Sequence, residues 1–144
     1  MQDTLHIRFA RHGMLLLLAG LLTGFGFGKF HNHHAGDAAH ITGLIGGFGL
    51  ISVGWLWPLL KLGRLWLQIG AWSFILSMEF SWLGLFLRAA LGSAPDAVSI
   101  DASAASWNLI GGRFLFAGVI LSVVGTLIAL IGLRPIRQGG GAAA

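Results

Sequence analysis

Four long apolar runs follow one another along this chain, and polar or basic residues separate them. The runs cover residues 13–28, 41–60, 65–87 and 114–133. A helix needs about 20 apolar residues to cross a bilayer, so the first run is slightly short and the others are long enough. A tight basic turn at Lys61 and Arg64 separates the second run from the third, and a longer polar connection precedes the fourth. The pattern predicts an all-α integral membrane protein, a four-helix bundle.

The four runs are expected to form one domain, because a chain of 144 residues leaves no room for a second. This domain takes in residues 1–138, and residues 139–144, GGGAAA, are expected to be a flexible tail. The first run also has the order of a secretory signal peptide, since Arg8 and Arg11 precede a run of leucines. No small-residue cleavage site follows at the usual place, so we expect this run to be a span.

The composition supports the membrane assignment and excludes several kinds of chemistry. Hydrophobic residues make up 56% of the chain and charged residues 10%, against about 25% charged residues in a soluble domain. The chain has no cysteine and no tyrosine, which excludes disulfides, thiolate metal sites, cysteine nucleophiles and phenolic acids. Its net charge of +4 comes from residues at the ends of the apolar runs, which indicates orientation in a membrane and not nucleic-acid binding.

Basic residues are distributed unevenly between the two ends of the predicted spans. The N-terminal head, the second connection and the C-terminal segment carry Arg8, Arg11, Lys61, Arg64, Arg134 and Arg137. The opposite side carries Lys29, Arg88 and Arg113. Because cytoplasmic segments are the more basic ones, both termini are predicted to be cytoplasmic, in a multi-pass protein of a bacterial-type inner membrane.

Small residues recur at spacings of three or four along each span. In the first span they are Gly20, Gly24 and Gly28, and in the second they include Gly43 and Gly47. Such stripes let helix backbones approach closely in lipid, where packing drives helix association. We expect a compact bundle and, because every span carries a stripe, a homo-oligomer.

The second span begins with a candidate cofactor ligand. His40 precedes the apolar run, and Gly43 and Gly47 share its face of a helix one and two turns further on. An imidazole beside a glycine-lined wall is what an axial haem ligand needs. A tightly packed start of a helix would have the same pattern, so both interpretations stay open.

The remaining histidines are weaker candidates. The polar segment before His40 contains His31, His33 and His34. These side chains are suitable ligands for a borderline metal ion, yet no cysteine or carboxylate cluster supports them, and an incidental loop cluster is the alternative. His6 and His12 flank a basic head and are expected to be solvated or interfacial.

The third span has a polar and aromatic face. Steps of four and three place Gln68, Trp72, Ile75, Glu79, Trp82 and Phe86 along one side of a helix. A carboxylate near the middle of a bilayer is costly unless it is neutral, paired or wetted, and it marks a candidate functional site. We therefore expect Glu79 to be the catalytic residue of a substrate pocket lined by Trp72, Trp82 and Phe86. The alternative is a structural hydrogen bond from Glu79 to another helix.

Three short stretches resemble a known family. RHGMLLLLAGLLTGFG (residues 11–26), AHITGLIGG (39–47) and GAWS (70–73) are similar to the small four-span membrane family that contains styrene oxide isomerase and hydroxylaminobenzene mutase. The resemblance implies haem b bound by His40 as its metal ligand, at a subunit interface of a homotrimer. It also implies that the ferric iron is a Lewis acid, with no redox turnover. The substrate would be a small hydrophobic aromatic compound, with an epoxide converted to a carbonyl or an aryl hydroxylamine to an aminophenol.

The chain departs from the family pattern at polar positions. Gly46 stands where the family usually has asparagine six residues after the histidine. Phe74 and Met78 are nearest to the positions where the isomerase has asparagine and tyrosine in the third span. These departures bear on epoxide chemistry more than on haem binding, and Glu79 is a candidate replacement. A non-enzymatic membrane assembly, or a haem- or metal-binding protein without isomerase activity, is the alternative function.

Overall fold

The computed structural model describes residues 3–93 and 102–133 of the chain. The long helices are α1 (Asp3–Phe25), α2 (His33–Leu56), α3 (Arg64–Leu91) and α4 (Ala102–Gly132), and the short 3-10 turns are η1 (Phe27–Lys29) and η2 (Trp57–Leu59). Within the described residues no strand occurs, and all four long helices are long and apolar enough to cross a membrane. The predicted fold class, an all-α four-span membrane protein, is confirmed.

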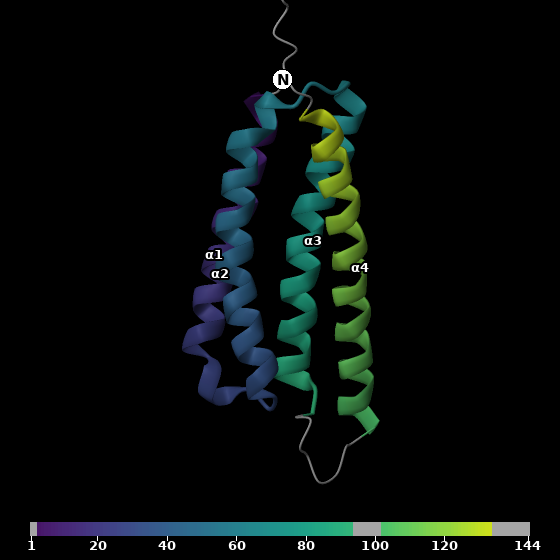
Figure 1. Cartoon of the computed structure of the whole chain (residues 1–144). Coiled ribbons are helices and arrows are strands. Elements are labelled where there is room, and N and C mark those ends of the chain that lie inside the picture. The colour runs from purple at the N-terminus through teal and green to yellow at the C-terminus, as the bar shows by residue number, and fades with distance from the viewer. Residues whose placement is uncertain (1–2, 94–101, 134–144) are drawn as a thin grey trace, which may run out of the picture.

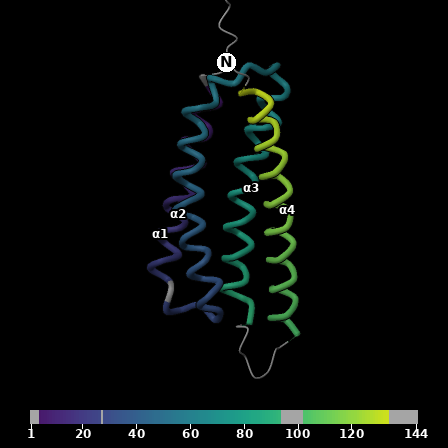
Figure 2. The backbone as a smooth tube through the Cα atoms, in the orientation of Figure 1, coloured from purple at the N-terminus to yellow at the C-terminus, as the bar shows by residue number. Residues whose placement is uncertain are grey.

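The helices run up and down along one common direction (Figure 1). α1 packs mainly on α2, α3 packs mainly on α4, and α2 joins the two pairs by packing on α3. The start of α1, the α2–α3 connection and the end of α4 lie at one end of the bundle, and η1 lies at the other (Figure 2). Lys61 and Arg64 therefore lie at the same end as Arg8 and Arg11.

The orientation of the protein in the membrane stays a prediction. The basic residues Arg134 and Arg137, on which it partly rests, lie outside the described residues, as does the tail 139–144.

Three helices begin earlier than the apolar runs predicted. α1 begins ten residues before residue 13, α2 eight before residue 41, and α4 twelve before residue 114. Hydropathy indicates only the apolar part of a helix. Backbone and capping hydrogen bonds allow the helix to begin earlier, in polar sequence. Asn32 shows this at α2, because its side-chain oxygen accepts a hydrogen bond from the Ala35 backbone N–H at 3.0 Å and caps the helix. His33 and His34 consequently lie in the first turn of α2 and not in a loop, and His40 lies about two turns inside the helix.

Glycines allow α1 and α2 to touch at the backbone. A Cβ atom on Gly43 would lie 2.5 Å from the Cα atom of Gly20, and one on Gly47 would lie 2.7 Å from the carbonyl oxygen of Gly13. Only hydrogen fits at these positions, as in close helix crossings in membranes. The small-residue stripes of these two spans thus serve packing within one chain.

The α3–α4 pair uses the same device. A Cβ atom on Gly84 would lie 2.6 Å from the carbonyl oxygen of Gly111, and one on Gly118 would lie 2.8 Å from the Ser77 carbonyl oxygen. Ser77 is almost fully buried, and its hydroxyl donates to the Phe74 carbonyl oxygen at 2.8 Å. Both pairs are therefore held at distances that larger side chains would not permit.

Large apolar side chains cover the outer surface, and the buried ones gather inside. Phe9 and Trp57 form the centre of the inner cluster, with ring centroids 5.0 Å apart and both side chains buried. Phe25, Phe48 and Trp55 are exposed on the outside. Large apolar side chains on the outer surface are expected of helices surrounded by lipid, where their exposure carries no cost.

Glycine substitutions in α2 test the backbone contact. Gly43→Ala should lower the free energy of unfolding by about 1–3 kcal/mol, because its methyl group overlaps the α1 backbone. Gly49→Ala is the matched control, since a Cβ atom there meets nothing within 4 Å. Its stability should stay unchanged or rise, as alanine favours the helix. Unfolding of both variants in mixed micelles measures the difference, and equal stabilities would contradict the packing described here.

Candidate functional site

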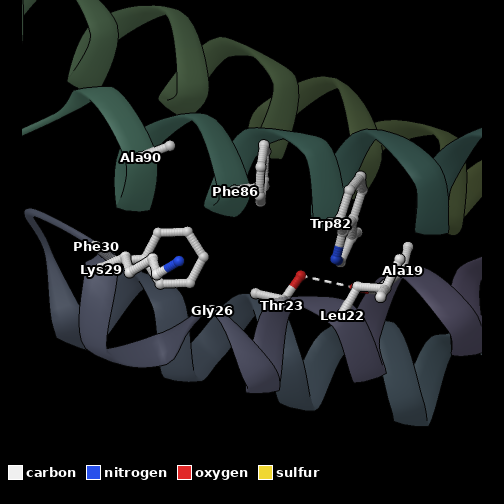
Figure 3. A pocket seen from close by; sticks show the side chains of 9 residues that line it. All are labelled: Ala19, Leu22, Thr23, Gly26, Lys29, Phe30, Trp82, Phe86 and Ala90. Atoms are coloured by element: carbon white, nitrogen blue, oxygen red, sulfur yellow. Dashed lines mark hydrogen bonds between the residues drawn. The ribbon is translucent and has the colours of Figure 1, made fainter.

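A cavity of about 470 Å³ lies between α1 and α3 near η1. It is lined by Ala19, Leu22, Thr23, Gly26, Lys29, Phe30, Trp82, Phe86 and Ala90 (Figure 3). Trp82 and Phe86 stack with centroids 5.1 Å apart, and Phe30 meets Phe86 edge-on at 6.0 Å. The volume lies within the range of small-molecule pockets, and the walls are apolar and aromatic.

A second cavity of about 240 Å³ lies beside the first along the same two helices. Ala19 and Trp82 line both cavities, and Glu79 lines the second. We refer to the two together as the α1–α3 groove. Its aromatic end holds Phe30 and Phe86, and its acidic end holds Glu79. The structure therefore brings together three predicted site residues, Glu79, Trp82 and Phe86.

Glu79 has a partner on another helix, His12 of α1. Its Oε1 atom lies 2.6 Å from Nδ1 of His12, and the two side chains are about one-third exposed. His12 belongs to α1 and not to a solvated head, because the helix begins at Asp3. His12 therefore has a side-chain partner, and its expected solvated or interfacial position stays a prediction. A histidine and a carboxylate at hydrogen-bond distance can share or transfer a proton, which is the basic requirement of acid–base catalysis.

Trp72 lies outside the groove, so its predicted place beside Trp82 and Phe86 is wrong. The Trp72 ring meets His12 edge-on at 5.8 Å, and the Arg8 guanidinium lies 5.6 Å from its centroid. Ten residues separate Trp72 from Trp82, which corresponds to about 15 Å along a helix. Of the six residues of the predicted face, Glu79, Trp82 and Phe86 line the groove.

His40 is held in a defined tautomer by α1. Its Nδ1 atom lies 2.8 Å from the Gly20 carbonyl oxygen. A carbonyl oxygen only accepts, so Nδ1 carries a hydrogen, and in the neutral imidazole the lone pair is on Nε2. A Cβ atom on Gly24 would lie 2.7 Å from the His40 ring, so a glycine is needed for the ring to lie there. A histidine whose Nδ1–H is bound to a backbone carbonyl is oriented to bind a metal through Nε2. This side chain fits the axial ligand of a haem.

Gly43 and Gly47 do not form the open wall predicted beside His40. The backbone of α1 covers both glycines, so a flat ligand has no room against them. His40 also lines neither cavity of the groove. Within one chain, the candidate cofactor ligand and the aromatic groove are two separate features.

The other histidines do not assemble into a metal site in the part of the chain that the structure describes. There, no group of three histidine, cysteine or acidic side chains lies close enough to hold a metal ion. The Nδ1 atom of His31 lies 3.0 Å from the carbonyl oxygen of Ala90, which is near the C-terminal end of α3. Asn32 adds a bond from its side-chain amide to the Ser93 carbonyl oxygen at 2.9 Å. This end of the histidine segment ties α2 to α3.

Two of the departures from the family pattern are neighbours in space. A Cβ atom on Gly46 would lie 3.3 Å from the Met78 sulfur atom. Phe74 packs edge-on against Trp57, with centroids 5.8 Å apart. The positions where the resemblance implies polar groups are therefore filled by an apolar contact between α2 and α3.

The fold defines a multi-pass membrane protein of four helices with an aromatic groove between α1 and α3. Residues 5–134 match the family described as Styrene oxide isomerase. The chain is also 32% identical over 125 residues to "Hydroxylaminobenzene mutase HabA" of Ectopseudomonas oleovorans, covering 84% of this chain and 93% of that protein. It is 32% identical over 139 residues to "Hydroxylaminobenzene mutase HabB" of the same organism, covering 91% of this chain and 84% of that protein. The chain therefore belongs to the styrene oxide isomerase family, as its motifs predicted.

Sequence reasoning missed His12 and Phe30 as members of the site. His12 is 67 residues from Glu79 in sequence, so no local spacing relates the two. One signal was available, because a carboxylate in a bilayer needs a partner and His12 directly precedes the first apolar run. Phe30 follows a short 3-10 turn that hydropathy does not predict.

A double-mutant cycle tests the contact between His12 and Glu79. His12→Ala and Glu79→Gln should each lower stability, and their effects should be non-additive, with a coupling above about 0.5 kcal/mol. His6→Ala is the control partner for Glu79→Gln, because His6 lies about 9 Å further along α1. That control cycle should be additive within about 0.5 kcal/mol. Additive effects for His12 and Glu79 would show that the two side chains do not interact.

Proposed function

We propose that this protein is a membrane-embedded isomerase that rearranges a small hydrophobic aromatic substrate with the help of haem b held by His40. The observation that carries the proposal is the bond from His40 Nδ1–H to the Gly20 carbonyl oxygen, which leaves Nε2 free. Membership of the family supports isomerisation, and the aromatic groove offers a place for a substrate that partitions into the bilayer.

An aryl hydroxylamine is the favoured substrate, and an aryl epoxide is the second choice. The relatives reported above are named hydroxylaminobenzene mutases. The polar groups implied for epoxide chemistry are replaced here by the Gly46–Met78 contact. Conversion of an aryl hydroxylamine to an aminophenol breaks the N–O bond, forms a ring C–O bond, and transfers one proton from the ring carbon to nitrogen. No oxidant or reductant is consumed, so the reaction is an isomerisation.

His40 has one task in this proposal, to hold the haem through Nε2. The Gly20 carbonyl oxygen fixes the tautomer, and the missing side chain at Gly24 leaves room for the ring. A bound ferric haem supplies a Lewis acid that stabilises negative charge on the substrate oxygen. Gly43 and Gly47 contribute indirectly, since their contact with α1 holds the Gly20 carbonyl oxygen in reach of the imidazole.

The assembly is proposed to be a homotrimer, as the resemblance implies. His40 and the α1–α3 groove do not share a cavity within one chain. A reaction that uses both therefore needs a second copy to bring a groove and a cofactor together. The exposed apolar side chains of α2, which include Ile41, Ile45 and Phe48, offer a surface for that contact.

The Glu79–His12 pair is proposed to move the proton that the rearrangement requires. Glu79 lines the groove, and His12 lies 2.6 Å from its Oε1 atom. One side chain can accept the ring proton while the other returns a proton to nitrogen. Glu79 is accordingly the catalytic residue of this proposal, and Trp82 and Phe86 bind the substrate.

Haem content tests the role of His40. His40→Ala should abolish the Soret band of the purified protein. Gly24→Ala should lower haem affinity about tenfold, because its methyl group overlaps the imidazole that the carbonyl oxygen orients. Gly28→Ala and His34→Ala are the controls, since a Cβ atom on Gly28 meets nothing within 4 Å and His34 is exposed. A Soret band that survives His40→Ala would overturn the ligand assignment. No Soret band in the unmodified protein, with haem supplied, would favour the non-enzymatic alternative.

Turnover of hydroxylaminobenzene and styrene oxide tests the role of Glu79. Glu79→Gln and Glu79→Leu should both lower kcat by about 10²–10⁴ with haem retained, because neither side chain transfers a proton. Gln68→Leu is the control on the same helical face, outside the groove, and should keep full activity. If Glu79→Gln were fully active and only Glu79→Leu impaired, the carboxyl would be a hydrogen-bonding group and not a proton carrier.

A further inference from the structure

The indole nitrogen of Trp82 lacks a partner in the residues that the structure describes. Its Nε1 atom is buried and makes no hydrogen bond there. The indole projects from α3 toward α1, with the nitrogen on the α1 side (Figure 3). Trp82 lines both cavities of the groove, so its side chain lies where the aromatic end meets the acidic end. A buried N–H without an acceptor needs an explanation, since most such groups in folded proteins are paired.

The other unpartnered polar atoms have different surroundings. The indole nitrogen of Trp57 is also buried without a partner, but its ring is enclosed by Phe9 and Phe74 and lines neither cavity of the groove. Arg88 and Asn108 lie close to Gly92, near the point where the described chain stops. An orphan indole is therefore not by itself a binding group in this bundle. Trp82 differs because open space adjoins it.

No acceptor of the groove is bonded to Trp82 in the described residues. The hydroxyl of Thr23 donates to the Ala19 carbonyl oxygen at 2.7 Å, and its oxygen accepts no hydrogen bond from the indole. The Glu79 carboxylate is engaged with His12 at the far end. Indole is a donor only, so it selects a ligand atom that accepts. Phe30 and Phe86 favour a ligand with an aromatic ring, which would pack against them while the acceptor atom lies at Trp82.

We infer that Trp82 donates a hydrogen bond from Nε1 to the oxygen atom of the substrate and so sets the substrate's direction in the groove. The oxygen then lies toward the Glu79 end, and the aromatic ring lies against Phe86 and Phe30. The ligand class is a neutral aromatic molecule with an acceptor oxygen within one or two atoms of the ring. This inference deepens the proposed function, because it assigns the group that recognises the substrate oxygen.

Two probes of the same shape isolate the hydrogen bond. 4′-Fluoroacetophenone has a carbonyl oxygen, and 4-fluoro-α-methylstyrene has a methylene group in its place. Binding of each probe to the full chain in lipid nanodiscs is followed by fluorine NMR. Trp82→Phe should weaken binding of the ketone by about three- to tenfold, the value of one hydrogen bond. It should change binding of the hydrocarbon less than twofold. Trp57→Phe is the matched control, which removes an orphan indole N–H outside the groove and should change neither affinity.

A second readout uses the unmodified protein and does not depend on whether Trp82→Phe folds. In protein labelled with ¹⁵N-tryptophan, the indole N–H signal of Trp82 should shift downfield with the ketone and stay in place with the hydrocarbon. Equal weakening of both probes by Trp82→Phe, no weakening of either, or an indole signal indifferent to the ketone would each overturn the inference. The binding test needs neither haem nor turnover, so a failure here would leave the isomerase proposal standing. Conversely, a protein without haem or turnover would still report on Trp82.

Discussion

The contact between Gly20 of α1 and Gly43 of α2 is the constraint on which the rest of the structure depends. A Cβ atom on Gly43 would lie 2.5 Å from the Gly20 Cα atom, so the two backbones meet directly. That approach puts the Gly20 carbonyl oxygen within 2.8 Å of Nδ1 of His40, one turn before Gly43. It also leaves Ala19 and Thr23 on the side of α1 that lines the groove with α3. The tautomer of His40 and the position of the α1–α3 groove thus both depend on the close packing of α1 on α2. In lipid, such packing contributes strongly to helix association.

The polar groups inside this bundle follow a single rule, because an unpaired polar group in hydrocarbon is costly. Thr23, Ser77 and Ser81 donate their hydroxyl hydrogens to carbonyl oxygens of their own helices. Glu79 and His12 satisfy each other across two helices. Among the described residues, the exceptions are four buried side-chain atoms without a partner, which belong to Trp57, Trp82, Arg88 and Asn108. Of these, Trp82 lines the groove. The proposed function gives its indole N–H a substrate oxygen and gives Nε2 of His40 a metal.

Separation of these two features within one chain is the physical reason for proposing an assembly of several copies. The groove lies between α1 and α3, whereas His40 lies between α1 and α2. A single copy holds the proposed ligand and the proposed substrate pocket apart. An active unit built from several copies would also cover the apolar face of α2, where Phe48 is exposed. Packing within the chain already uses Gly13, Gly20, Gly43 and Gly47, so contacts between copies must use other residues.

The sequence by itself determined the class of the protein: hydropathy identified four spans, and three short motifs identified the family. It determined the helical face that carries Glu79, Trp82 and Phe86, because residues of one helix are related by a fixed period. Only the tertiary structure decided which residues of other helices meet that face. His12 pairs with Glu79 across 67 residues of sequence, and α1 covers the glycines beside His40. Contacts between helices depend on their rotation and depth, and these are set by packing over the whole bundle, which no local spacing records.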